Sequence, residues 1–172
     1  MSVYLDYNAS GLVRPEVQAI MADVLAQGGN PNAVHAFGRR ARARIETARA
    51  QVAGLVGADG TSVIFSSGGT ESNAQDVASA LKDGCERVIV SATEHPCVAE
   101  AAAMSGAAVE VLPVDADGVV VLDWLKAALE RPGRCLVAIH HANNESGVIQ
   151  PIAEAATLVR AVDGWLHVDA IQ

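Results

Sequence analysis

The sequence predicts an α/β fold, in which a mostly parallel sheet carries helices on both faces. Three observations lead to this prediction. Helical patterns alternate with short strands along the 172 residues. The strands are apolar at nearly every position, which is typical of strands buried on both faces. Glycine and proline residues separate consecutive segments, as in chains built from βαβ units.

Two helices are expected before the first strand. Pro15 has the position of a first-turn proline, and it begins a helix over Glu16–Gln27 that a pair of glycines ends. Apolar residues recur at helical spacing over Ala36–Val56, from Ala41 to Leu55, and predict one buried face. The arginines of this segment lie mostly off that face, so we interpret them as a solvated or interface surface rather than an anion site.

Strands and helices then alternate. Asp123 is expected to cap a helix over Trp124–Glu130, and Asp117-Gly118 is expected to form a tight turn before that helix. The predicted strands are Ser62–Ser66, Arg87–Ser91, Ala108–Pro113, Cys135–His140 and Trp165–Asp169. The predicted helices are Thr70–Leu81, Pro96–Ser105, Trp124–Glu130 and Ile152–Ala161. A central parallel strand needs cover, and none follows the last strand, so we expect a fold that is incomplete at its C-terminus.

Composition excludes several classes of protein. Hydrophobic residues make up 51% of the chain and charged residues 19%, which excludes a disordered chain. The net charge of −8 opposes nucleic-acid binding. No apolar run reaches the length of a membrane span, and the N-terminus has no signal-peptide pattern, so we expect no membrane association. The three cysteines form no CxxC pair, which suits a reducing compartment and predicts a cytoplasmic protein.

Polar side chains follow the predicted strands at their carboxyl ends, while the strands themselves are apolar. Ligands of open parallel sheets bind at this edge, so these segments predict the site. The segments are Ser66–Ser72, Thr93–His95, Asn143–Gly147 and Asp169 with Gln172.

The first two segments offer an anion site and a proton-exchanging ring. Gly68, Gly69 and Thr70 open a helix whose N–H groups and dipole favour a phosphate, although a plain helix start explains the same residues. They fit neither of the glycine-rich patterns of ATP and dinucleotide sites. His95 precedes a proline at a helix start, where it is either a group that stacks on a planar cofactor and exchanges protons or an ordinary polar residue.

The other two segments offer a carboxylate and neutral amides. Asp169 ends an apolar strand, and a carboxylate there needs a partner such as a cation or a protonated ring nitrogen. Asn144 and Gln172 are either donors to a phenolate oxygen or ordinary loop amides. His140 and His141 point to opposite faces of a strand, so we expect no metal site.

Six ordered motifs resemble those of the cysteine desulfurase group, within the class V aminotransferase family of fold type I pyridoxal-phosphate enzymes. They extend over nearly the whole chain. The motifs are Tyr4–Ala9, Gly29–Pro31 with His35 and Gly38, Gly68–Ser72, Thr93–His95, Asn143–Glu145 with Gly147 and Gln150, and His167–Ala170 with Gln172.

The resemblance implies a role for each site residue toward pyridoxal 5′-phosphate. Asp169 pairs with the protonated pyridine nitrogen, and this protonation makes the ring an electron sink. His95 stacks on the ring as the catalytic residue that moves protons. Asn144 and Gln172 bond to the ring hydroxyl.

The resemblance also implies parts of the site that this sequence does not contain. Gly69 and Thr70 correspond to residues that bind the cofactor phosphate. The Schiff-base lysine and the nucleophilic cysteine of the family lie beyond the strand that ends at Asp169. The sequence holds only two lysines, Lys82 and Lys126, and neither is expected to replace the Schiff-base lysine. We therefore expect the chain alone to be inactive.

The implied domain organisation is an arm over residues 1–14 and, over residues 15–172, the N-terminal part of a cofactor-binding large domain without its small C-terminal domain. The implied activity releases sulfur from L-cysteine and leaves L-alanine and an enzyme persulfide for sulfur transfer and iron–sulfur cluster assembly. A sulfur-acceptor protein and a second copy of the chain are the implied partners. A selenocysteine lyase, a transaminase, or a truncated chain without catalysis are the alternatives.

Overall fold

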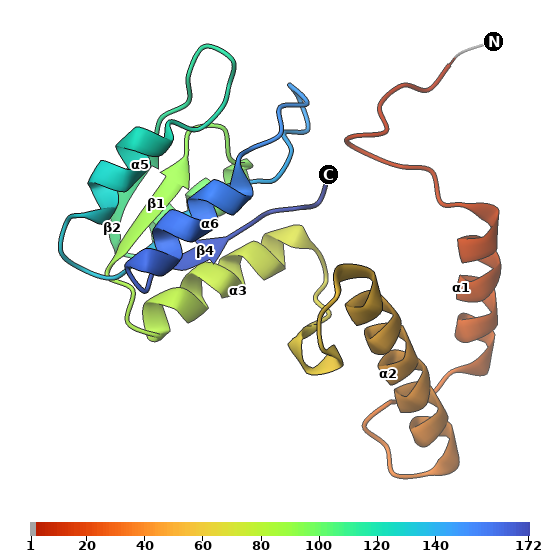
Figure 1. Cartoon of the computed structure of the whole chain (residues 1–172). Helices are drawn as coiled ribbons and strands as arrows, with labels where there is room; N and C mark the ends of the chain where they lie inside the picture. Colours follow the sequence, from red (N-terminus) through yellow and green to blue (C-terminus); the bar gives the residue numbers. More distant parts are fainter. Residues whose placement is uncertain (1–2) are drawn as a thin grey trace. The chain divides into compact units, whose positions relative to one another are not determined.

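The computed structural model describes residues 3–172, which form two compact units that meet in the sequence between Phe65 and Ser66. Figure 1 shows the helices and strands of each unit. Among residues 3–172, no helix has both the length and the apolar character needed to cross a membrane.

The second unit contains a four-stranded parallel sheet in the order β2-β1-β3-β4. Its strands are β1 (Arg87–Ser91), β2 (Ala108–Leu112), β3 (Cys135–Ala138) and β4 (Trp165–His167). The chain passes from β1 to β2 on one side and then continues with β3 on the other side of β1. The strand order therefore reverses between β1 and β3, and such a reversal leaves a crevice at the carboxyl ends of the strands.

Helices cover both faces of this sheet, which confirms the predicted fold class. Side chains of β1 alternate between two buried clusters, as the period of a strand requires. Val88 and Val90 pack with α3 (Gly69–Lys82) and α4 (Pro96–Met104). Ile89 faces the opposite way.

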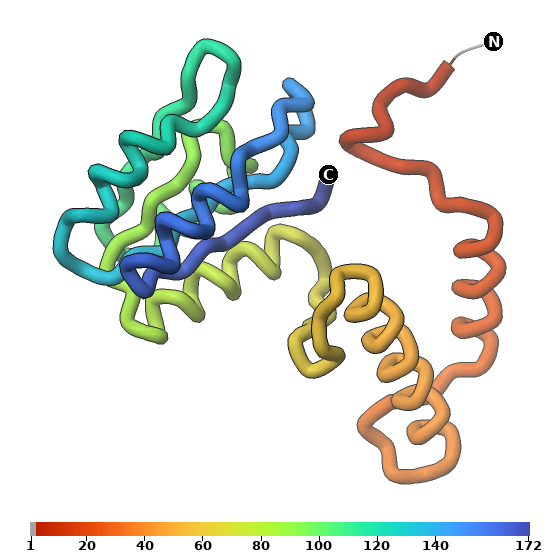
Figure 2. The backbone as a smooth tube through the Cα atoms, in the orientation of Figure 1, coloured from red at the N-terminus to blue at the C-terminus, as the bar shows by residue number. Residues whose placement is uncertain are grey.

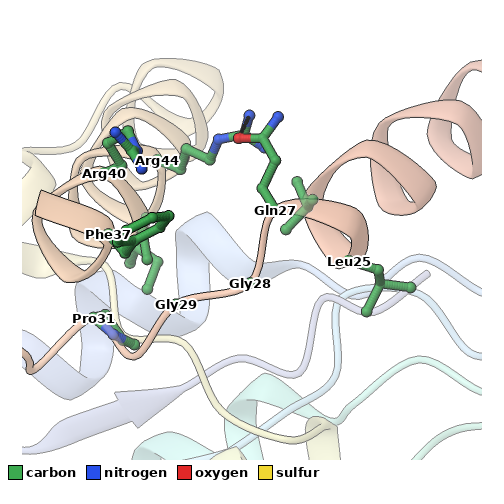
Figure 3. A pocket seen from close by; sticks show the side chains of 11 residues that line it. Leu25, Gln27, Gly28, Gly29, Pro31, Phe37, Arg40 and Arg44 are labelled. Atoms are coloured by element: carbon green, nitrogen blue, oxygen red, sulfur yellow. Dashed lines mark hydrogen bonds between the residues drawn. The ribbon is translucent and has the colours of Figure 1, made fainter.

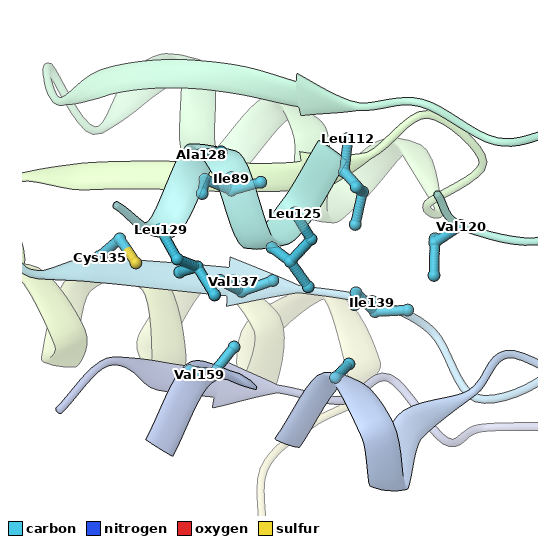
Figure 4. Close-up of a cluster of buried hydrophobic side chains, with 11 residues drawn as sticks. Ile89, Leu112, Val120, Leu125, Ala128, Leu129, Cys135, Val137, Ile139 and Val159 are labelled. Atoms are coloured by element: carbon cyan, nitrogen blue, oxygen red, sulfur yellow. The ribbon is translucent and has the colours of Figure 1, made fainter. Parts of the chain in front are cut away.

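The second cluster lies under α5 (Leu122–Leu129) and α6 (Ile152–Ala161). Figure 4 shows Leu125 of α5 between Ile89 and Val137, and all three side chains are fully buried. Each such side chain contributes roughly 1.5–3 kcal/mol through burial of apolar surface.

Two predictions about local structure were wrong. The segment 62–66 is not a strand: a 3-10 turn over Gly60–Ser62 precedes an extended stretch that pairs with no described residue. Ile64 is 79% exposed, so the stretch has the composition of a strand but no neighbouring strand to complete its hydrogen bonds. Asp123 does not cap α5, because the helix already begins at Leu122 and Asp123 lies in its first turn. A carboxylate there favours the helix through the macrodipole alone.

The first unit contains the two predicted helices, α1 (Pro15–Gln27) and α2 (Ala36–Val56), which Figure 2 shows as successive coils of the tube. Gly38 is required at the start of α2, because a Cβ atom there would lie 2.2 Å from the carbonyl oxygen of Ala33. The expected apolar face of α2 is only partly buried, and Leu55 is 85% exposed.

An apolar pocket lies between the end of α1 and the start of α2 (Figure 3). The two arginines that line it, Arg40 and Arg44, contact other side chains of this unit. The Arg40 guanidinium lies 4.5 Å from the centre of the Phe37 ring, and Arg44 bonds to Asp23 at 3.0 Å and to Gln27 at 2.7 Å. These contacts agree with the interpretation that the arginines of this helix form a surface rather than an anion site.

One buried arginine holds the amino ends of the strands together. Arg87, the first residue of β1, is 9% exposed, and its Nη2 donates to Glu110 of β2 at 2.7 Å and to the carbonyl oxygen of Ala128 at 2.9 Å. Its Nη1 donates to the carbonyl oxygens of Arg131 and Pro132. A single side chain thus links two strands to the connection between α5 and β3.

Replacing this arginine tests its contribution to stability. Arg87→Met leaves the half-buried Glu110 carboxylate with only the Arg131 side chain and leaves a buried carbonyl oxygen without its donor. We expect the free energy of unfolding in urea to fall by about 3 kcal/mol. Arg160→Met, an exposed site on α6, is the matched control and should change it by no more than about 0.5 kcal/mol. Equal effects of the two variants would contradict the role of Arg87.

Candidate active site

The carboxyl ends of β1, β3 and β4 bring the candidate residues of three loops to one edge of the sheet. Backbone pairing continues beyond the strands at this edge, because the His141 N–H donates to the carbonyl oxygen of Asp169 at 2.8 Å. The loop after β4 is therefore held against the loop after β3. This places Asp169 beside the reversal of strand order between β1 and β3.

Two donors orient the Asp169 carboxylate. Its Oδ2 accepts a hydrogen bond from Nδ2 of Asn73 at 2.9 Å, and its Oδ1 accepts one from the N–H of Ile171 at 3.1 Å. Asn73 lies on α3 and is 4% exposed, so it is a rigid support. The sequence analysis missed Asn73, although its position within the first turns of the helix after the glycine pair was a usable signal.

His95 caps the N-terminus of α4 in the extended conformation expected before a proline. Its Nδ1 accepts a hydrogen bond from the N–H of Cys97 at 3.3 Å and lies 2.9 Å from the Cys97 sulfur. Because Nδ1 accepts, the neutral ring carries its proton on Nε2. The side chain is exposed, so Nε2 is accessible for proton exchange.

Gly69 and Thr70 are the first two residues of α3, and no side chain caps this helix. The first N–H groups of a helix have no partner within it, so they can bind an anion. A Cβ atom on Gly69 would meet nothing within 4 Å, so the glycine leaves open space rather than filling a packing requirement. The nearby Glu71 carboxylate accepts from the hydroxyl and the N–H of Ser67, both at 2.6 Å, and these bonds lower the pKa of Glu71.

The loop after β3 is organised by Asn143, which presents Asn144. The side-chain oxygen of Asn143 accepts from the N–H groups of Glu145 and Ser146 at 2.9 and 2.8 Å. Its Nδ2 donates to the carbonyl oxygen of Thr93 at 3.1 Å and so joins the loops after β1 and β3. Asn144 is partly buried next to this junction.

Gln172 is exposed at the end of the sequence, three residues beyond Asp169. The structure thus brings His95 and Asp169 into one hydrogen-bonded cluster with Asn73 and Cys97. The roles of the Asn144 and Gln172 side-chain amides toward a ligand stay predictions.

A buried glutamate and a buried histidine lie behind this edge, and the sequence analysis gave neither a role there. The side chains of Glu94 and His140 are 1% and 6% exposed, and Oε2 of Glu94 lies 4.0 Å from Nδ1 of His140. That distance is too long for a hydrogen bond. Oε1 of Glu94 and both ring nitrogens of His140 have no hydrogen-bond partner in the part of the chain that the structure describes.

Burial decides the charge state of this pair. It raises the pKa of Glu94 from 4.5 to about 7, with hydrogen bonds from the His95 and His140 backbones opposing the rise and the Asp169 charge adding to it. Burial lowers the pKa of His140, and Asp169 opposes that shift. Just below pH 7 Glu94 is therefore mostly protonated, and the lowered pKa of His140 favours its neutral ring, so their proximity is not an ion pair.

A second histidine connects β4 to α3. Nδ1 of His167, at the end of β4, lies 3.0 Å from Oδ2 of Asp76 on α3, and the histidine side chain is 7% exposed. Because Asn73 lies one turn earlier on the same helix, this contact helps to keep Asp169 in reach of Asn73.

Neither lysine belongs to this cluster. Lys82 is the last residue of α3 and lies twelve positions after Thr70, a distance of about 18 Å along the helix axis. Lys126 lies on α5, which covers the opposite face of the sheet from α3. Between residues 3 and 172 there is also no group of three side chains that could ligate a metal ion.

The comparisons with known proteins cover the chain from end to end. The family model described as Aminotransferase class-V matches residues 3–172. The chain is 42% identical over 177 residues to a protein named cysteine desulfurase IscS from Dictyoglomus turgidum, and the match covers 99% of this chain and 45% of that relative. The chain therefore spans less than half the length of the curated relatives it matches.

Solved structures agree with this assignment. A NifS-like protein has a TM-score of 0.91 and 34% identity, with 100% of this chain and 50% of that chain covered. A structure titled SspA in complex with cysteine has a TM-score of 0.91 and 31% identity, covering 99% of this chain and 51% of the other. With a family model matched over residues 3–172, the chain belongs to the aminotransferase class-V family.

Proposed function

We propose that this chain holds the cofactor of a pyridoxal-phosphate-dependent cysteine desulfurase, which converts L-cysteine to L-alanine and transfers the sulfur to an enzyme cysteine as a persulfide. The observation that carries the proposal is the cluster in which the Asp169 carboxylate and the His95 ring are linked through Asn73 and Cys97. The similarity to proteins named cysteine desulfurase supports the choice of reaction.

The side chains at this edge fit the chemistry of pyridoxal phosphate. The carboxylate of Asp169 is a partner for a protonated pyridine nitrogen. Hydrogen bonds from Asn73 and from the N–H of Ile171 fix the orientation of this carboxylate. The uncapped start of α3 offers N–H groups to a phosphate. The exposed ring of His95 offers a planar surface for stacking. When bound, pyridoxal phosphate supplies an electron sink for a carbanion next to the substrate nitrogen.

Each residue then has a defined task. The carboxylate of Asp169 would hold the protonated ring nitrogen of the bound cofactor. His95 exchanges a proton through Nε2, because the backbone N–H of Cys97 occupies Nδ1. Gly69 and Thr70 bind the phosphate, and Asn144 and Gln172 are proposed to hold the ring hydroxyl.

The Glu94–His140 pair limits the charge at this edge. Because Glu94 is protonated below about pH 7, no second negative charge lies beside Asp169. A cationic ring nitrogen would therefore be attracted to Asp169 rather than shared between two carboxylates.

The proposal extends to the setting of the complete protein. It assigns residues 15–172 to a cofactor-binding large domain, and it includes a homodimer, a sulfur-acceptor protein and a role in iron–sulfur cluster assembly, which the name of the relative IscS supports. Three free cysteines, two of them buried, suit a reducing compartment and support a cytoplasmic location.

Cofactor binding provides the first test. Asp169→Asn removes the charge that faces the ring nitrogen, and a charge-assisted hydrogen bond contributes about 1.5–3 kcal/mol. We expect the affinity of the chain for pyridoxal phosphate, measured by equilibrium dialysis with absorbance detection, to fall about ten- to a hundredfold. Asp123→Asn, an exposed site on α5, is the matched control and should not change it. Unchanged affinity in Asp169→Asn would contradict the assigned partner of the ring nitrogen.

The reaction itself provides the second test. Because neither Lys82 nor Lys126 lies at the site, the 172-residue chain should form no L-alanine from L-cysteine above a pyridoxal-phosphate blank. A polypeptide that joins this chain to the lysine-bearing half of a cysteine desulfurase should form L-alanine and, with dithiothreitol, release sulfide. Transamination of L-cysteine without sulfide release by that polypeptide would exclude the proposed reaction.

The neutral state of Glu94 predicts a pH-dependent stability. Its pKa is higher in the folded chain than in the unfolded chain, so the folded state loses stability as the pH rises through about 7. Glu94→Gln removes this loss. We expect the stability gained in the variant, from urea unfolding, to be roughly 2 kcal/mol larger at pH 8 than at pH 5.

The control for this experiment is Glu100→Gln, an exposed site on α4, which should give the same small difference at both pH values. A gain in Glu94→Gln that is larger at pH 5 than at pH 8 would show that Glu94 is ionised in the folded chain.

A further inference from the structure

A chain of hydrogen bonds connects the two residues that are proposed to touch the cofactor ring. Asn73 Nδ2 lies 2.9 Å from Asp169 Oδ2 and 3.2 Å from the sulfur of Cys97. The same sulfur lies 2.9 Å from Nδ1 of His95. Asp169 and His95 are thus linked through two side chains that the sequence analysis did not assign to the site.

The chemistry of the groups fixes the direction of each bond. An ionised carboxylate only accepts, so the NH₂ group of Asn73 faces Asp169. An NH₂ group has two hydrogens, and the second can donate to the sulfur of Cys97. The sulfur then accepts from Asn73, and its S–H is available to donate to Nδ1 of His95.

A second donor acts on the same nitrogen of His95. The backbone N–H of Cys97 points at Nδ1 from 3.3 Å, in the N-cap position of α4. A proton on Nδ1 would face this N–H and the positive end of the helix dipole. Both donors therefore disfavour the tautomer with its proton on Nδ1.

We propose that Asn73 and Cys97 are positioning residues, which hold the Asp169 carboxylate and keep the neutral His95 ring in the tautomer with its proton on Nε2. The task of Asp169 and His95 toward the cofactor rests on the proposed function, whereas the link between them rests on distances in this chain. Burial supports the assignment: Asn73 is 4% exposed, and Cys97 packs against the apolar cluster under α3 and α4.

The tautomer of His95 can be measured without cofactor or activity. In the ¹⁵N-labelled 172-residue chain at a pH where imidazole is neutral, Nδ1 of His95 should resonate as a nitrogen without hydrogen and Nε2 as an N–H nitrogen. Cys97→Ala removes the S–H donor but keeps the backbone N–H. Since one hydrogen bond contributes about 0.5–1.5 kcal/mol, the ratio of the two tautomers should fall about two- to tenfold. Cys97→Ser should restore most of the ratio, because its hydroxyl group can donate.

Asn73→Asp tests the other end of the link. The new side chain has the shape of asparagine but no NH₂ group: it shares a proton with the Asp169 carboxylate, and it offers the sulfur of Cys97 only an acceptor, which competes with His95 for the S–H. The tautomer ratio should fall by a similar factor. Gln75→Glu makes the same change of group on the exposed side of α3, and it should leave the ratio unchanged.

A proton on Nδ1 in the unsubstituted chain would overturn the proposal. So would an unchanged ratio in Cys97→Ala. If Asn73→Asp does not fold, the comparison of Cys97→Ala with Cys97→Ser decides. None of these outcomes depends on desulfurase activity, so the link can fail while the proposed function stands, and the reverse also holds.

Discussion

The parallel sheet is buried on both faces, and this burial decides where polar side chains can lie. A strand covered by helices on each side tolerates almost no polar side chain along its length, so polar groups are displaced to its ends. Ile89 and Val137, for example, are completely buried, whereas Glu94 and Asp169 follow their strands. The reversal of strand order between β1 and β3 then opens one edge to a ligand.

The two ends of the sheet carry polar networks with different tasks. At the amino ends, Arg87 bonds to Glu110 and to backbone carbonyl oxygens, and all five N–H groups of its guanidinium have a partner within the chain. At the carboxyl ends, the network of Asp169, Asn73 and Cys97 ends at the exposed ring of His95. The network of Arg87 therefore contributes stability. The network of Asp169 holds reactive groups in place at the carboxyl ends of the strands, where the reversal of strand order leaves a crevice.

The carboxyl edge also contains groups that a fold selected only for stability would avoid. Glu94 and His140 bury polar atoms that bond to no described residue, and such atoms cost free energy. The cost is reduced because burial favours the neutral form of both side chains, raising the pKa of Glu94 to about 7 and lowering that of His140. Unfavourable groups of this kind are concentrated at functional sites in proteins generally, which agrees with the assignment of the site to this edge.

The helices, the four paired strands and the edge that carries the polar residues were predictable from the sequence, because they depend on periodicity, glycine and proline positions, and unbroken apolar runs. Ala36–Val56 has the bounds that its pattern predicted. Strand pairing was not predictable in the same way: the segment 62–66 has the composition of a strand, but it pairs with no other strand of the described residues. The contact of Asn73 with Asp169 arises only in the folded chain, since these residues are 96 positions apart. The raised pKa of Glu94 likewise depends on how the folded chain excludes water. Local patterns record what a segment favours, whereas the geometry and charge of a site depend on contacts that form only when distant segments pack.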